Sequence, residues 1–112
     1  MKKIEAIIRP EKFEEVKEAL KRAGYPGMTR TPVEGHGRQK GLKAQFRGTV
    51  YEIEFVPKLK IEIVARDEDV PHIVDAIVTS ARTGEEGDGK IFILSVESAI
   101  KIRTGETGKG AI

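Results

Sequence analysis

The chain has 112 residues, which suits one domain with a modest hydrophobic core. Charged residues make up 34% of the chain, but the net charge is only +2, which argues against a dedicated nucleic-acid binder. Cysteine is absent, which excludes disulfides and thiolate metal sites, and the two histidines are too far apart in sequence to form a ligand-spaced metal cluster.

The first predicted elements are a strand and an amphipathic helix. The start of the chain, KKIEAIIRP, reads as a buried strand that ends at Pro10. Residues 10–24 predict a helix whose single apolar face is made of Phe13, Val16, Leu20 and Ala23. Gly24 is expected to be the C-terminal cap of this helix.

Two further strands are predicted in the middle of the chain. Residues 28–34 are weakly strand-like, and Pro32 among them favours an edge position. In the stretch 51–65, YEIEFVPKLKIEIVA, apolar and polar residues alternate, which places on one face Leu59, Ile61 and Ile63.

A second helix and a last strand follow. Residues 67–84 carry an apolar stripe at helical spacing, formed by Val70, Ile73, Val74, Ile77, Val78 and Ala81. Asp67 or Asp69 would cap its start and Gly84 its end. The segment KIFILSVE, residues 90–97, reads as a buried strand.

The chain also contains an internal repeat. With a shift of about 57 positions, residues 4–20 lie over residues 61–77, and the apolar positions of the two predicted helices coincide. Two strand–helix–strand units in tandem predict an α+β, ferredoxin-like βαββαβ fold with an antiparallel sheet. The helices would cover one face of the sheet, and a homo-oligomer would cover the other.

A glycine-rich loop lies between the second helix and the last strand. Residues 84–90 fit most of a Walker A pattern, G-x-x-x-x-G-K. A Walker A loop leads from a strand into a helix and continues with Ser or Thr, whereas this loop leads into a strand and continues with Ile91. Two interpretations remain: a helix end followed by a turn, or a phosphate cradle of another kind.

Two other segments are rich in glycine and in basic residues. Residues 35–48 contain four cations and no acid, in a stretch of about 20 residues before the next firm strand, which is typical of a functional or a flexible loop. RNA binding is a weaker option, because the predicted strands lack the aromatic residues of RRM domains. In the segment 101–110, Lys101 and Arg103 would leave the same face of an extended chain and could clamp a phosphate.

Together these segments resemble the PII nitrogen-regulatory signal transducers (GlnB/GlnK type). The resemblance covers essentially the whole chain and is carried by GRQKG, YEIEFVPKLKIEI, TGEEGDGKIF and KIRTGE, at 37–41, 51–63, 83–92 and 101–106. It implies one PII-like domain over 1–112, assembled as a compact homotrimer with nucleotide sites between subunits. It also implies three named loops: a T-loop at 37–55, a B-loop at 82–90 and a C-loop at 102–109.

The resemblance implies which residues bind ligands. ATP or ADP would contact Thr29, Gly37, Arg38, Gln39, Val64, Gly87, Asp88, Gly89, Lys90, Lys101, Ile102 and Arg103. The cations at 101 and 103 would come from the neighbouring subunit. The ligand 2-oxoglutarate would be bound by Gln39, Lys40, Gly41 and Lys58, with Gln39 also joining the coordination of Mg²⁺. Tyr51 matches the position that is uridylylated in enteric members.

By this resemblance the protein is a signal transducer rather than an enzyme. Its T-loop would control an ammonium transporter, glutamine synthetase or its adenylyltransferase, or a nitrogen sensor kinase. Since no segment suits a signal peptide or a membrane span, a cytoplasmic protein is expected that meets the membrane only through a transporter. The alternatives are a small ferredoxin-like ATPase or other nucleotide-dependent enzyme, and an RNA-binding module. Two positions depart from the family pattern: Lys101 replaces the usual arginine, and His36 a common aromatic.

Overall fold

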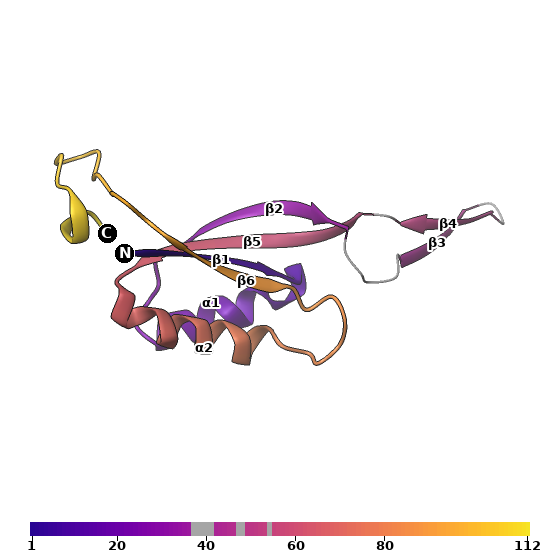
Figure 1. Cartoon of the computed structure of the whole chain (residues 1–112). Helices are drawn as coiled ribbons and strands as arrows, with labels where there is room; N and C mark the ends of the chain where they lie inside the picture. The colour runs from indigo at the N-terminus through magenta and orange to yellow at the C-terminus, as the bar shows by residue number, and fades with distance from the viewer. Residues whose placement is uncertain (37–41, 47–48, 54) are drawn as a thin grey trace.

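The computed structural model describes residues 1–36, 42–46, 49–53 and 55–112, without the side chains of 42–53. The main sheet has four strands, in the order β2 (Thr29–Gly35), β5 (Val56–Ala65), β1 (Lys2–Ile8) and β6 (Lys90–Ser95). All neighbouring pairs in it are antiparallel. The helices α1 (Phe13–Arg22) and α2 (Val70–Ala81) lie side by side on one face of the sheet (Figure 1). This arrangement confirms the predicted ferredoxin-like α+β fold.

The core lies between the two helices and the facing side of the sheet. Alternate residues of the central strands β1 and β5 point into it because successive side chains of a strand point to opposite faces. The helices contribute residues at helical spacing. The buried residues are Ile4, Ala6, Ile8, Val16, Leu20, Leu59, Ile61, Ile63, Ala65, Ile73, Ile77 and Ala81. The predicted periodicities of both helices and of β5 are thereby confirmed.

Helix α1 ends as the sequence predicts. A short 3₁₀ turn, Pro10–Lys12, precedes it. At its C-terminus Gly24 adopts a φ of 96°. The N–H of Tyr25 donates to the carbonyl of Leu20 (2.8 Å) and the N–H of Gly24 to that of Lys21 (3.0 Å), which is the Schellman pattern. Ala23, predicted on the apolar face, is instead exposed, because it lies beyond the last full turn.

The predicted caps of α2 are wrong. Asp69 occupies the N-cap position but makes no capping bond, and its carboxylate accepts a hydrogen bond from the Tyr25 hydroxyl (3.0 Å). Asp67 lies in the preceding 3₁₀ turn, Asp67–Asp69, and pairs with the N-terminal ammonium of the chain (3.0 Å). The helix ends at Ala81 because Arg82 is already extended, so Gly84 belongs to the loop beyond.

The last strand is not buried within one chain, contrary to the prediction. Phe92 and Ile93 are each 51% exposed and Leu94 is 44% exposed. The physical reason is that Phe92 and Leu94 lie on the sheet face without helices, opposite Glu5 and Lys3, and that β6 is an edge strand, which leaves Ile93 exposed as well. Periodicity alone does not say what covers a strand.

The C-terminal segment also differs from the prediction. Residues 102–104 form a turn, and Ile100 makes an isolated bridge with Thr107. The carbonyl of Lys101 accepts from the N–H of Gly105 (2.8 Å), and the N–H of Lys101 donates to the carbonyl of Glu106 (2.9 Å). Lys101 and Arg103 therefore do not leave one face of an extended chain.

The long loop predicted between β2 and β5 contains a two-stranded sheet, β3 (Leu42–Phe46) paired with β4 (Thr49–Ile53). Residues 51–53 of β4 belong to the stretch 51–65, for which the alternation predicts one strand, and the structure divides this stretch between β4 and β5. For β3 the sequence carries no firm signal. The ribbon of β3 and β4 lies beyond the end of the main sheet (Figure 1). Among the described residues, no helix is long and apolar enough to cross a membrane.

Candidate functional site

The glycine-rich loop connects the end of α2 to the start of β6. Residues 82–89 form the loop, and Lys90 is the first residue of β6, opposite Ile7 of β1. The order helix, loop, strand confirms that this is not a Walker A loop, because no helix N-terminus faces it from the following segment.

Asp88 closes the loop from inside. One of its carboxylate oxygens accepts from the N–H groups of Thr83 and Gly84, both at 2.8 Å. The other accepts from the Thr83 hydroxyl and from the Nε of Arg9, the latter at 3.1 Å. These bonds, the one from the Thr83 hydroxyl above all, hold the pKa of Asp88 well below its usual range. Since its charge is satisfied within the protein, Asp88 need not repel an anion bound at the loop.

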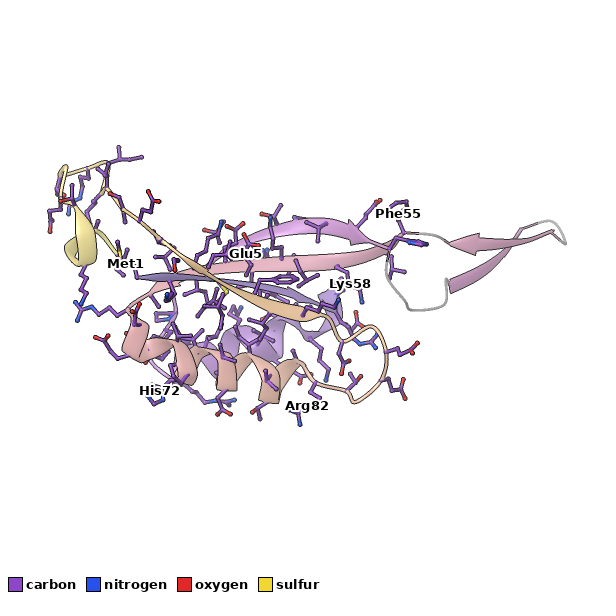
Figure 2. All side chains as sticks on the ribbon, viewed as in Figure 1. Met1, Glu5, Phe55, Lys58, His72 and Arg82 are labelled. Carbon is purple, nitrogen blue, oxygen red and sulfur yellow. The ribbon has the colours of Figure 1, made fainter. Side chains whose placement is uncertain are left out.

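Two cations, Arg9 just after β1 and Lys58 in β5, hold the carbonyl groups at the tip of the loop. The Nη2 of Arg9 donates to the carbonyl of Glu86 (2.7 Å), and the Nζ of Lys58 donates to the carbonyl of Gly87. Lys58 lies where β5 approaches the loop (Figure 2). Burial and the nearby charge of Arg9 lower the pKa of Lys58. An anion bound near both cations would relieve this repulsion.

The tip of the loop presents free donors. In the described part of the chain, the N–H groups of Glu86 and Gly87 form no hydrogen bond, whereas the turn at 86–87 directs the N–H of Asp88 towards the carbonyl of Glu85. Consecutive free N–H groups next to cations are a recurring way of binding phosphate. Gly89 lets the loop pass close to β1: with its φ of 102°, a Cβ here would lie 1.7 Å from the carbonyl oxygen of Ile7. A side chain at this position would displace the loop.

The two positions expected to hold adenine lie on the open face of the sheet. Thr29 is opposite Glu62 in the β2–β5 register, and Val64, two residues further along β5, is 40% exposed. Both therefore belong to the face that carries no helix. Val64 is opposite Lys3, near the start of β1, whereas the glycine loop meets the end of β1 at Ile7.

The predicted C-loop cations are also distant from the glycine loop within one chain. The segment after β6 runs past the N-terminus, where the N–H of Val96 donates to the carbonyl of Met1 (3.2 Å). In Figure 1 this segment lies at one end of the sheet and the loop 82–89 at the other. The Nζ of Lys101 lies 3.9 Å from the Oε1 of Glu106 in an exposed ion pair. One chain therefore brings together Lys58 with Gly87, Asp88, Gly89 and Lys90, but not with Thr29, Val64, Lys101, Ile102 or Arg103.

Several predicted ligand-binding residues lie outside the described residues. These are Gly37, Arg38, Gln39, Lys40 and Gly41; the side chain of Tyr51 is likewise not described, although its backbone belongs to β4. At the borders of this segment, the rings of His36 and Phe55 are 5.6 Å apart and inclined by 49°. His36 thus keeps an aromatic contact at the base of the predicted T-loop.

Arg9 is a residue of the site that sequence reasoning missed. It follows the first strand directly, and 79 positions separate it from Asp88. Its place between a buried strand and a proline gave no local sign of a function. The repeat offers one signal: a shift of 57 aligns Arg9 with Arg66, but nothing in that alignment indicates the loop that it contacts.

Comparison with known proteins agrees with this architecture. Residues 1–106 match the family model "Nitrogen regulatory protein P-II". The chain is 59% identical, over all its 112 residues and 97% of the relative, to "Nitrogen regulatory protein P-II 2" of Methanothermobacter thermautotrophicus. It is 57% and 56% identical, over the full length of both chains, to "Nitrogen regulatory protein P-II" of Cereibacter sphaeroides and of Microchaete diplosiphon. The chain therefore belongs to the nitrogen regulatory protein P-II family of signal transducers.

Proposed function

We propose that the protein binds ATP or ADP and 2-oxoglutarate between the subunits of a homotrimer, and that it controls partner proteins through its T-loop. The observation that carries this proposal is the loop tip, where the free N–H groups of Glu86 and Gly87 lie beside Arg9 and Lys58. Such donors fit the phosphates of a nucleotide. Lys90, at the start of β6, adds another cation next to them.

The open face of the sheet supports a shared site. Thr29 and Val64 lie on this face: Thr29 is level with Glu5 in the middle of β1, and Val64 is opposite Lys3, towards the end of the sheet where the segment after β6 runs. A neighbouring copy that covers the exposed β6 would place its adenine-binding and C-loop residues beside the glycine loop of the first chain. Nucleotide binding and assembly would then be linked, since each site needs two chains.

The second ligand is a dicarboxylate. Lys58 uses one of its three ammonium protons for the carbonyl of Gly87, which leaves two for a carboxylate of 2-oxoglutarate. No group of three metal-binding side chains exists in the described ranges, so Mg²⁺ would depend largely on oxygens of the two ligands, with Gln39 as a protein ligand. This makes Mg-ATP a condition for binding 2-oxoglutarate.

The ligands would act on the T-loop because Gln39 and Lys58 lie at its two borders. Mg-ATP with 2-oxoglutarate would stabilise one loop conformation, and ADP another, by contacting the two states differently. The proposed partners are an ammonium transporter, glutamine synthetase or its adenylyltransferase, or a nitrogen sensor kinase. Tyr51 is the candidate site of uridylylation. No chemical step on the nucleotide is proposed. Among the described residues around the glycine loop, Asp88 has the most strongly shifted pKa, but its carboxylate is already hydrogen-bonded within the loop and serves to hold it.

Titration calorimetry tests the proposal. We expect 2-oxoglutarate to bind in the presence of Mg-ATP and to bind at least about tenfold more weakly with Mg-ADP or with no nucleotide. Lys58→Gln should reduce the affinity for 2-oxoglutarate much more than the affinity for ATP, because glutamine can still donate to Gly87 but carries no charge. Lys17→Gln, which removes a cation from the surface of α1, is the matched control. Equal binding of 2-oxoglutarate with and without Mg-ATP would refute the scheme.

A further inference from the structure

The direction of the free donors in the glycine loop is set by the groups that hold its carbonyls. A peptide unit is planar and trans, so the carbonyl of one residue and the N–H of the next point in opposite directions. The carbonyl of Glu86 is turned towards Arg9, and that of Gly87 towards Lys58. The N–H of Gly87 is therefore aimed away from Arg9, into the open side of the loop, whereas the N–H of Asp88 lies within the turn at 86–87 and faces the carbonyl of Glu85.

Arg9 holds this geometry through two contacts at once. Its Nη2 holds the carbonyl of Glu86 at 2.7 Å, and its Nε holds the carboxylate of Asp88 at 3.1 Å. Asp88 in turn binds Thr83 and Gly84 at the neck of the loop. One guanidinium thus connects the tip of the loop to its neck. The side chain of Arg9 is only 19% exposed and that of Asp88 24%, so water screens their attraction partially.

The backbone around Arg9 is well placed to fix the loop. Arg9 follows the central strand β1 directly and precedes Pro10, whose ring restricts the backbone. The guanidinium is planar, and its donors are fixed relative to one another. A loop held from such a base loses less freedom when it binds an anion than a loop that must first be ordered.

From these contacts we propose that Arg9 is a positioning residue of the phosphate-binding loop: it aims the N–H of Gly87 at the anion. The inference rests on the proposed binding of nucleotides at this loop. It concerns the phosphates alone, because the residues expected to hold adenine lie apart from the loop: Thr29 is on the opposite edge strand, β2, and Val64 is opposite Lys3, whereas the loop meets β1 at Ile7.

The test separates the phosphate from the base. ADP and adenosine are titrated into the wild-type protein, Arg9→Gln, Arg9→Lys and the control Arg22→Gln, which removes an exposed arginine from the last turn of α1. We expect Arg9→Gln to weaken ADP binding at least about tenfold and to leave adenosine binding within about twofold. Arg9→Lys should be intermediate, because an ammonium keeps the charge but lacks the fork that reaches Glu86 and Asp88 together. Arg22→Gln should bind both ligands like the wild type.

A second measurement needs no nucleotide. In amide NMR spectra of the unliganded proteins, Arg9→Gln should shift the resonances of Gly87 and Asp88 and speed their hydrogen exchange, while Arg22→Gln should not. If the wild-type protein binds ADP and Arg9→Gln binds it equally well, the inference is overturned and the proposed function stands. If neither the wild type nor any variant binds adenine nucleotides, the proposed function fails. In that case the NMR spectra still test Arg9: if the amide resonances and exchange rates of Gly87 and Asp88 are the same in Arg9→Gln as in the wild type, the role of Arg9 is overturned as well. Should Arg9→Gln not fold, Arg9→Lys decides both readouts.

Discussion

At the scale of single residues, the hydrogen bonds of Asp88 change what its negative charge implies for phosphate binding. In the sequence, an aspartate inside a glycine loop counts against phosphate binding. In the structure its oxygens are held by Thr83, Gly84 and Arg9, which offset the negative charge. The same bonds keep its pKa well below the usual value, so the carboxylate stays ionised at any pH at which the protein would act.

Asp88 should make the stability of the protein depend on pH. Its pKa is lower in the folded chain than the value of about 3.9 expected in the unfolded chain. Its contribution is therefore complete above about pH 4 and is lost as the pH falls towards the folded pKa. We expect the difference in free energy of unfolding between wild type and Asp88→Asn, from urea titrations, to be largest near pH 7 and to shrink below pH 4.

The control for this experiment is Asp75→Asn, which changes an exposed carboxylate on α2. Its difference from the wild type should stay small across the same range. A difference between wild type and Asp88→Asn that is the same at pH 7 and at pH 3 would contradict the role given to the Asp88 carboxylate.

At the scale of elements, two glycines with nearly the same backbone conformation do different work. Gly24 has a φ of 96° and ends α1, and an added Cβ would meet nothing within 4 Å. Gly89 has a φ of 102° and joins the loop to β6, where an added Cβ would be 1.7 Å from the carbonyl oxygen of Ile7. The first position needs glycine for its conformation alone, and the second needs it also for space.

Alanine substitutions separate these two requirements. Gly24→Ala should lower the free energy of unfolding by about 1–2 kcal/mol, the cost of a left-handed conformation for a residue with a Cβ. Gly89→Ala should lower it by roughly 1–3 kcal/mol more, because β1 and the loop must also move apart. Urea unfolding at one protein concentration measures both values. Equal losses in the two variants would show that the contact with Ile7 does not constrain the loop.

At the scale of the whole molecule, a single chain leaves one face of its main sheet uncovered by helices. Phe92 and Leu94 lie opposite Glu5 and Lys3, on the sheet face without helices, and both are substantially exposed. The glycine loop and the segment after β6 lie at opposite ends of the sheet. A trimer would cover this face and would bring the loop of one chain to the C-terminal segment of its neighbour.

Mixed trimers test this sharing of sites. Chains with Lys90→Ala and chains with Lys101→Ala and Arg103→Ala should each bind ADP weakly as pure assemblies. After joint unfolding and refolding, a trimer that contains both kinds of chain has one interface between an intact loop and an intact C-terminal segment. We expect calorimetry to detect this restored fraction of tight sites. If mixing restores no tight binding, the cations at 101 and 103 do not act on a neighbouring chain.

Much of the site was accessible from sequence because its signals are local. The pattern GDGKIF marked the loop from Gly87 to Lys90, and the structure places Lys58 beside it. Arg9 escaped notice because its partner is 79 positions away. The roles of Thr29, Val64, Lys101, Ile102 and Arg103 remain predictions, as do those of Arg38, Gln39 and their neighbours.

By itself the sequence determined the types of the two helices and of the four strands of the main sheet, the faces of the helices and of β5, and the βαββαβ order. These properties depend on the spacing of apolar residues along a few turns or a few strand positions. Only the tertiary structure decided that β6 is an exposed edge, that Asp69 bonds to Tyr25 instead of capping α2, and that Arg9 reaches Asp88. Each of these three features depends on strand order or on contacts between residues that are distant in the chain. The spacing of neighbouring residues does not determine such contacts.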